Sequence, residues 1–164
     1  LPEADVIIFN IGNRPAHWGD MPKKLGYLDL MHVASWQISF KRESIVNNNV
    51  YFDEHMGAGS GNGAEEEFRF LTDCRKNGLA IYYVPFVIAD VAQTKSTWFK
   101  GYNEEFFINR GNTTRYIMGY VPAVLYAAYY SIRKRHQFDS DISWFKAFRL
   151  IMKGIHENRL GKKK

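Results

Sequence analysis

The sequence predicts a mixed α/β fold, and three observations lead to that prediction. A short run rich in Ile and Val at residues 5–11 is typical of a buried strand. A second apolar run at residues 79–84 follows a helical stretch that ends at Asn77-Gly78. From residue 97 onward the apolar spacing is helical. We therefore expect a sheet with flanking helices, followed by a helical tail.

The elements between the two strands are shorter and less regular. Residues 13–22 contain Gly, Pro and Asn and predict a loop, and residues 23–33 predict a helix or an irregular crossing segment. Residues 35–42 alternate polar and apolar side chains, which indicates a half-buried strand. Residues 43–49 are compatible with a short helix that ends in a run of Asn.

A helix is expected over residues 64–77, and it leads into the second strand. Gly78 supplies the stop that helices prefer at this position. The strand at residues 79–84 is closed by Pro85, because proline cannot donate a hydrogen bond to a neighbouring strand. Residues 86–89 are expected to continue the strand after a kink.

The C-terminal third predicts two helices. Residues 116–135 are apolar, with Pro122 in the first turns, but their apolar core of about 14 residues is shorter than the roughly 20 needed to span a bilayer. Residues 143–156 form a basic amphipathic pattern. Its apolar face holds Trp144, Phe148, Ile151 and Ile155, and its opposite face holds Lys146, Arg149 and Lys153.

Charge is distributed unevenly along the chain. Residues 131–164 hold ten Lys and Arg against three Asp and Glu, whereas residues 1–130 hold twelve against fourteen. A basic segment confined to one end fits an anionic membrane surface or a solubilising tail. A nucleic-acid partner is disfavoured, because the basic residues are not interleaved with aromatic residues along one stripe. The amphipathic face has an equally direct interpretation, which is packing on the body of the domain.

The single cysteine and the first residues indicate the compartment in which the protein is expected to fold. Cys74 is the only cysteine, so no internal disulfide can form, which favours a reducing compartment. Residues 1–9 lack the basic start and the small-residue cleavage site of a signal peptide. The chain begins without Met and is expected to be an excised fragment.

A glycine-rich loop that runs into carboxylates is the most distinctive motif. Residues 57–63 contain four glycines, and three glutamates follow at positions 65–67. Glycines let a backbone approach a ligand closely. Carboxylates at a helix start are also stabilised by the helix dipole, so a simple acidic cap is the alternative interpretation. The loop lacks the Gly-Lys-Ser/Thr ending of a nucleoside triphosphatase.

The order of motifs around this loop resembles the family-2 glycosyltransferases. Phe52-Asp53-Glu54 precedes the loop, the acidic helix follows, and the strand ends in Tyr82-Tyr83-Val84-Pro85. Upstream, residues 35–42 are similar to the strand that precedes this motif in the family, and downstream Ser96-Thr97-Trp98-Phe99 is similar to a segment of one bacterial branch. The resemblance covers roughly residues 5–115. It implies the C-terminal part of a GT-A type mixed sheet with flanking helices.

The resemblance also implies a catalytic base. Counted back from Gly78, the family's carboxylate pair falls on Glu66 and Glu67. Glu67 would be the general base that activates the acceptor hydroxyl, in place of the family's usual Asp, with Glu66 or Glu65 as the alternative. Direct displacement with inversion needs one such base within hydrogen-bond reach of the attacking hydroxyl. Adjacent carboxylates raise one another's pKa, which favours a basic site.

A divalent cation, Mn²⁺ or Mg²⁺, is implied by the same resemblance. The family's metal-binding Asp-x-Asp motif would come just before this chain begins, and Asp139-Ser-Asp141 lies instead in the basic tail. Some members place a His ligand after the Tyr-x-x-Pro strand, and here Asp90 stands near that point. Asp is a suitable ligand for a hard cation. A strand-end Asp that caps the next turn is the alternative.

Substrate contacts are expected from the loop and from one tryptophan. Gly59, Ser60 and Gly61 lie in the glycine-rich loop, and Ser96 and Trp98 lie in a polar segment. Aromatic faces and directed polar groups hold sugars. A core or capping role is the alternative for Trp98. Two further residues are weaker candidates: Trp36 is expected in the core, and His55 lies near the proposed site.

These observations combine into one functional prediction. Residues 1–115 would form the acceptor-side and catalytic-base half of a glycosyltransferase domain, and residues 116–164 a helical, basic extension. The donor would be a nucleotide-diphosphate sugar and the acceptor a glycan or lipid-linked molecule. The protein is expected to be cytoplasmic, peripheral on the inner face of the membrane through its tail. The rival interpretation is a non-catalytic carbohydrate-binding or membrane-docking module.

Overall fold

The computed structural model describes residues 1–12, 18–57, 60, 65–91, 99 and 101–162. It divides into two compact units, Leu1–Lys95 and Ser96–Lys164, which are described separately below. The chain is divided between residues 95 and 96, whereas the boundary predicted between residues 115 and 116 falls within helix α3 (Glu104–Met118). The predicted boundary separates functional regions and stays a prediction.

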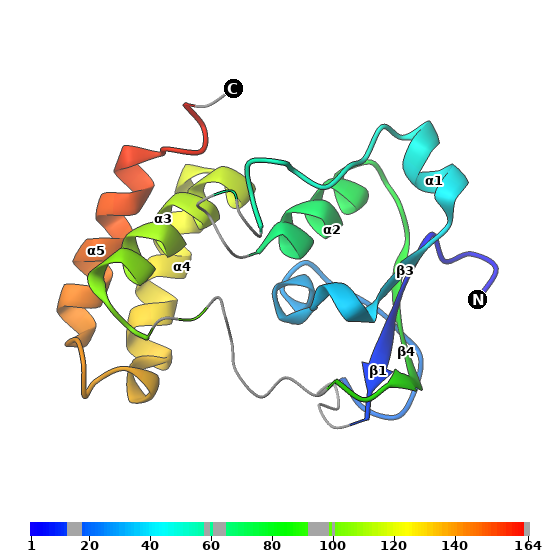
Figure 1. Cartoon of the computed structure of the whole chain (residues 1–164), viewed down its shortest axis with the longest axis horizontal. Coiled ribbons are helices and arrows are strands. Elements are labelled where there is room, and N and C mark those ends of the chain that lie inside the picture. The colour runs from blue at the N-terminus through cyan, green and yellow to red at the C-terminus, as the bar shows by residue number, and fades with distance from the viewer. Residues whose placement is uncertain (13–17, 58–59, 61–64, 92–98, 100, 163–164) are drawn as a thin grey trace. The chain divides into compact units, whose positions relative to one another are not determined.

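The first unit is built on a mixed sheet of four strands among the described residues, in the order β2-β4-β1-β3 (Figure 1). The central strands β1 (Val6–Ile11) and β4 (Ile81–Ala89) are parallel. The outer strands β2 (Lys23–Lys24) and β3 (Ile38–Phe40) are antiparallel to their neighbours. The α/β class predicted from the sequence is confirmed.

Helix α2 (Glu66–Lys76) lies alongside this sheet in Figure 1 and leads into β4. Its buried face includes Phe68, Leu71 and Cys74. Burial raises the pKa of the Cys74 thiol to about 12, so this side chain packs as a neutral group. The predicted stop is confirmed, because Gly78 has a φ of 79° and its N–H donates to the Arg75 carbonyl.

The segment before α2 differs from the sequence prediction at residues 35–42. Residues 35–42 form a 3-10 turn, η2 (Ser35–Gln37), then the short strand β3 and the start of α1 (Arg42–Asn47). The Gln37 side chain accepts from the Ala34 N–H and donates to the Phe9 carbonyl, which favours the turn over a longer strand. Residues 23–33 contain β2 and the 3-10 turn η1 (Asp29–His32).

Strand β4 contains a bulge at Pro85. The register with β1 runs evenly to the pair Phe9–Val84, and the next pair is Asn10–Val87. Since Pro85 has no N–H to donate, the ladder skips this position and the strand resumes beyond it. The predicted kink after Pro85, with the strand continuing to residue 89, is confirmed.

Asp5 fixes the start of the parallel pair. Its carboxylate accepts hydrogen bonds from the Ser44 hydroxyl, at 2.6 Å, and from the Ala80 N–H, at 2.8 Å. The Ser44 hydrogen bond, followed by the Ala80 hydrogen bond, lowers the pKa of Asp5. One ionised side chain therefore joins the beginnings of β1, α1 and β4.

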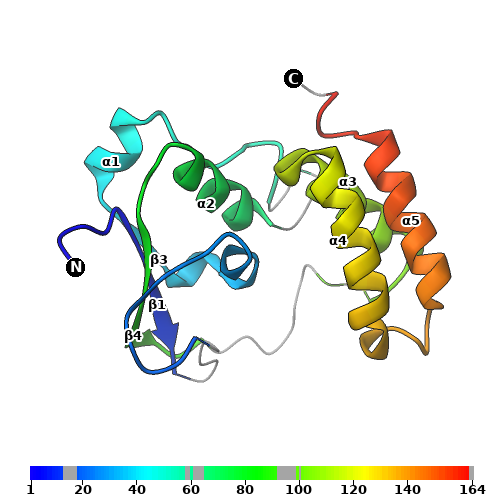
Figure 2. The same ribbon diagram turned by 180° about the vertical axis from the view of Figure 1, so that it is seen from behind.

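The second unit contains three α-helices among its described residues: α3 (Glu104–Met118), α4 (Tyr120–Arg133) and α5 (Trp144–Glu157), with the 3-10 turn η3 (Arg135–Gln137) between the last two (Figure 2). The prediction of one helix over residues 116–135 is wrong at its start. Gly119, with φ 87° and ψ 179°, separates α3 from α4 in a conformation that favours glycine. Pro122 lies in the first turn of α4, as predicted.

Helices α3 and α5 pack closely through two glycines. A Cβ at Gly154 would collide with the Ile108 carbonyl oxygen, and a Cβ at Gly111 would collide with the Ile151 carbonyl oxygen. The core of the unit surrounds this crossing and includes Phe107, Ala123, Ala127, Tyr130, Phe138, Ile142, Ala147, Ile151 and Ile155. No helix within the described residues is long and apolar enough to cross a membrane.

Candidate functional site

The acidic start of α2 is shaped by the turn that precedes it. Gly57 has a φ of 86°, and both the N–H and the hydroxyl of Ser60 donate to its carbonyl oxygen. The Glu66 carboxyl group packs against Gly57, where an added Cβ would lie 2.9 Å from Cδ and Oε1 of Glu66. Glycine at position 57 therefore leaves the space that the Glu66 carboxyl group occupies.

The Glu66 carboxyl group is in an environment that disfavours its charge. Burial raises its pKa, and the neighbouring charge of Glu67 acts in the same direction, whereas a hydrogen bond from its own backbone N–H acts in the opposite one. A carboxylate with a raised pKa accepts a proton more readily, so Glu66 is the alternative base beside Glu67.

Glu67 is held by a different partner. Its Oε1 atom accepts a hydrogen bond from the backbone N–H of Ser35, at 3.2 Å, which joins the start of α2 to η2. Gln37, in the same turn, donates to the Phe9 carbonyl of β1 at 3.1 Å. These bonds place Glu67 beside the segment that contacts the second half of β1.

This position corresponds to the carboxyl end of the parallel strands. Helix α2 ends at Lys76 and β4 begins at Ile81, so the C-terminal end of α2 adjoins the amino end of the parallel pair. Its start, with Glu66 and Glu67, therefore faces the opposite end. In open α/β sheets ligands bind outside the carboxyl ends of the strands.

Asp90 lies at the same end of the parallel pair. It follows β4 directly, and its carboxyl group is exposed and lies against Gly12, where a Cβ would collide with its Oδ1 atom. The Gly12 N–H donates to the Ala89 carbonyl at 3.1 Å. Within the described residues, no group of three or more His, Cys, Asp or Glu side chains is arranged to hold a metal ion.

Four of the predicted substrate contacts fall outside the described residues: Gly59, Gly61, Ser96 and Trp98. Ser60 is described and closes the Gly57 turn. The core position predicted for Trp36 is wrong, because its side chain is 40% exposed. The alternating pattern that suggested a strand is a 3-10 turn here, so Trp36 does not share the inward face of a sheet. Gln37 at the third position of the turn, from which its side chain can accept from the Ala34 N–H, is the sequence feature that indicates this turn.

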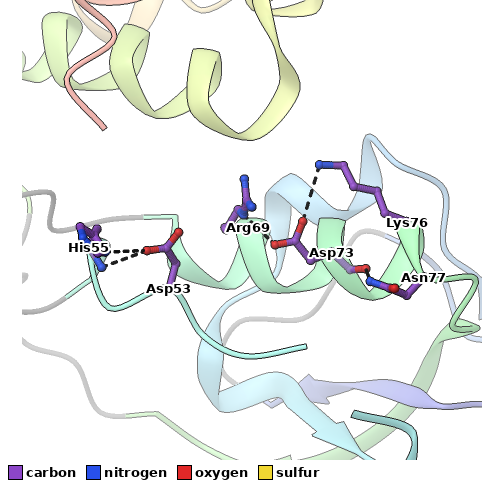
Figure 3. A network of polar contacts seen from close by, with 6 residues as sticks. All are labelled: Asp53, His55, Arg69, Asp73, Lys76 and Asn77. Carbon is purple, nitrogen blue, oxygen red and sulfur yellow. Dashed lines mark hydrogen bonds and ion pairs between the residues drawn. The ribbon is translucent and has the colours of Figure 1, made fainter. Parts of the chain in front are cut away.

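Polar contacts stabilise α2 and the segment at residues 53–55 that precedes it (Figure 3). Asp73 pairs with Arg69, at 2.7 Å between Oδ2 and Nε, and with Lys76 at 3.6 Å. In the segment before the loop, His55 lies 3.4 Å from Asp53 and donates its backbone N–H to the same carboxylate oxygen. The helix pairs are spaced three and four residues apart, which is the spacing that stabilises helices.

Comparisons of the chain with protein-family models, with curated proteins and with solved structures find no match. The resemblance to glycosyltransferases therefore rests on the motif order in this sequence. The geometry contributes two adjacent carboxylates with different surroundings at the carboxyl end of a parallel pair. Such an arrangement can hold a hydroxyl-bearing ligand and accept its proton.

Proposed function

We propose that this chain is the acceptor-side and catalytic-base part of an inverting glycosyltransferase of the GT-A type. The observation that supports it best is the position of Glu66 and Glu67 at the start of α2, with Glu67 bonded to η2. The donor is a nucleotide-diphosphate sugar, and the acceptor is a glycan or a lipid-linked molecule on the cytoplasmic side of a membrane. The motif order around residues 52–85 supports the same proposal.

In this reaction Glu67 accepts the proton of the acceptor hydroxyl while that oxygen attacks the anomeric carbon. The bond from the anomeric carbon to the diphosphate breaks on the opposite face, which inverts the configuration. A hydroxyl is a weak nucleophile until its proton is removed, so the base lowers the barrier. A bound Mn²⁺ or Mg²⁺ would supply charge that offsets the diphosphate leaving group. Asp90, an exposed oxygen ligand at the end of β4, would contribute to holding it alongside ligands from a preceding half.

Paired variants in the full-length protein test the assignment of the base. Glu67→Gln is expected to lower kcat by about 10²–10⁴-fold, the usual contribution of a general base. Glu66→Gln, one residue away, is the matched control and is expected to retain most of the turnover. Loss of turnover in Glu66→Gln alone would move the base to Glu66, and full turnover in both would refute a catalytic role for the pair.

A measurement of folding stability shows whether Glu66→Gln, the control variant, is as stable as the unchanged protein. Because the folded state raises the pKa of Glu66, ionisation of this group weakens folding as the pH rises through that pKa. Glu66→Gln removes this penalty, so the free energy of unfolding at pH 7 should be unchanged or higher. The difference should vanish below the unfolded pKa of about 4.3, where both forms are uncharged.

Calorimetry tests whether this chain is the acceptor-side part of the enzyme or the part that binds the nucleotide-sugar donor. The isolated chain is expected to bind a panel of nucleotide-sugars weakly in the presence of Mn²⁺ and to show no transfer, because the family's Asp-x-Asp motif is expected in a preceding half. Tight, cation-dependent binding to this chain alone would contradict that expectation.

A second candidate function is a non-catalytic carbohydrate-binding module, and one observation favours it. Trp36 is exposed on η2, next to the Ser35 N–H that binds Glu67. An aromatic face beside directed polar groups is how proteins hold sugars. Glycan binding that is lost in Trp36→Ala, together with unchanged turnover in the glutamate variants, would favour this module over the enzyme.

A further inference from the structure

Helix α4 presents a second apolar face that lies outside the core. Ala123, Ala127 and Tyr130 point into the core of the second unit. Four large apolar side chains repeat at intervals of four, four and three residues on another face, and we call them the α4 stripe. They are Val121 (66% exposed), Leu125 (67%), Tyr129 (53%) and Ile132 (55%). Contiguous exposed apolar surface of this kind marks an interaction site.

The charged side chains of α4 and of the residues directly after it are all basic, and the first carboxylates beyond them are Asp139 and Asp141. The sequence has no Asp or Glu between Glu105 and Asp139, and α4 runs directly into Arg133, Lys134 and Arg135. Arg133 and Arg135 are exposed, as is His136 beside them. A partner of the stripe would therefore meet basic groups and no carboxylate from this stretch of chain.

Aromatic side chains are also exposed at this end of the unit. Figures 1 and 2 both show the C-terminal end of α4 beside the start of α5. Trp144 and Phe145, the first residues of α5, are exposed there. Trp and Tyr are enriched where a protein meets the boundary between lipid and water, because their rings are apolar and their tips polar.

We propose that the α4 stripe, with Arg133 and Arg135, docks the protein on the surface of an anionic lipid bilayer. The helix would lie in the plane of the interface, with its apolar side chains among the acyl chains and its basic end at the head groups. Each basic residue near such a surface adds about 1 kcal/mol, and salt weakens the attraction. This surface does not depend on the proposed transferase activity.

The structure places this surface on a different helix from the one the sequence suggested. The sequence predicts the apolar face of α5 as the docking element, but Ile151 and Ile155 are buried in the core of the unit. The alternative interpretation made from the sequence, packing of that face on the domain, is the one that holds for these two residues. Docking through α4 leaves Ile151 and Ile155 in their structural role.

A second copy of the chain is a poorer occupant of the stripe. A standard protein interface uses about 20–30 residues on each side, and the α4 stripe has four. A second copy would also bring the same basic residues and no carboxylate from this stretch, so it would not neutralise Arg133 and Arg135. Anionic lipid head groups supply the missing charge, and acyl chains accept the apolar side chains.

Vesicle sedimentation of the whole chain tests the proposal. Vesicles of phosphatidylcholine alone are compared with vesicles that also contain phosphatidylserine, at low and at high salt. Binding is expected only with phosphatidylserine and should weaken with salt. Leu125→Gln with Tyr129→Gln is expected to lower the partition coefficient at least about tenfold, which corresponds to 1.4 kcal/mol. Arg133→Gln with Arg135→Gln should weaken binding and flatten its salt dependence.

A matched pair on another helix controls for general loss of charge and apolar surface. Val46 and Arg42 are exposed on α1, so Val46→Gln with Arg42→Gln should leave vesicle binding unchanged. All the substituted side chains are exposed, and circular dichroism verifies that each variant is folded. No binding to anionic vesicles at low salt, or equal weakening in the α1 variant, would overturn the proposal. So would self-association in ultracentrifugation that Leu125→Gln abolishes, which would assign the stripe to a second copy.

Discussion

Helices α4 and α5 are each 14 residues long and each have an apolar face, but they use these faces differently. Ile151 and Ile155 of the α5 face are buried in a core shared with α3 and α4, whereas Trp144 at the start of that face is exposed. The large side chains of the α4 stripe stay exposed. Periodicity therefore identifies which face of a helix is apolar, but it does not identify what covers that face.

Small residues show which face of each helix points inward. The inward face of α4 contains Ala123 and Ala127, and that of α5 contains Ala147 and Gly154. Small side chains let two helix backbones approach closely, so they gather where helices touch. In this unit the position of small residues predicts the packed face better than the position of large ones.

The largest effect is expected when one large side chain on each of the two helices is replaced by alanine. Ile151→Ala should lower the free energy of unfolding by about 2–5 kcal/mol, because it opens a cavity in the core. Leu125→Ala, on the exposed stripe, should change it by less than about 0.5 kcal/mol. Urea unfolding of the two variants measures both values, and similar losses would mean that α4 is also covered.

The next test concerns the crossing of α3 and α5. Gly154→Ala should lower the free energy of unfolding by about 3 kcal/mol, because the added methyl group would collide with the Ile108 carbonyl oxygen. Lys153→Ala, at the neighbouring exposed position, is the control and should have little effect. Retained stability in Gly154→Ala would show that the helices can separate without loss.

A smaller effect is expected where α5 ends. The buried Asn112 side chain of α3 accepts a hydrogen bond from the Arg159 N–H at 2.7 Å. Asn112→Ala leaves that donor without its acceptor and should lower the free energy of unfolding by about 1–2 kcal/mol. Urea unfolding compared with Asn109→Ala, also on α3 but outside the core, would isolate the effect. Equal losses in the two variants would contradict the assigned role.

The smallest effect is expected at the start of α5. The Lys146 hydrogen bond and its charge lower the pKa of Glu104, at 2.6 Å between Nζ and Oε1. A lowered folded pKa favours folding above the unfolded pKa, and this contribution is lost as the pH falls through the folded pKa. Lys146→Ala should return the pKa of Glu104 towards its ordinary value in an NMR titration. An unchanged titration would show that this pair does not form in solution.

Local patterns predicted the main elements of the first unit because their causes are local. The Ile-rich run at β1, the Gly78 stop of α2 and the Pro85 kink each follow from the chemistry of nearby residues. Strand β2 has two residues and pairs with β4, which lies far along the chain. No local sequence pattern therefore predicts it. Gly119 lies within an apolar run, so periodicity does not separate α3 from α4, although the backbone conformation of Gly119 ends α3.

The candidate site shows a similar division. The sequence places Glu66 and Glu67 at a helix start, but their surroundings depend on residues far along the chain. The bond from Ser35 to Glu67 spans 32 positions, and the packing of Glu66 on Gly57 depends on the turn closed by Ser60. The exposure of Trp36 follows from the η2 turn and contradicts the alternating pattern.

The bonds of Asp5 have a consequence for the order in which the chain folds. Asp5 contacts Ser44, 39 positions away, and Ala80, 75 positions away. Closing such long loops is slow, whereas consecutive helices form from contacts close in sequence. After dilution from denaturant, helical signals from residues 104–157 should recover first. The signals of the parallel strands should recover last, in a step that slows when Asp5→Ala removes the group joining their starts.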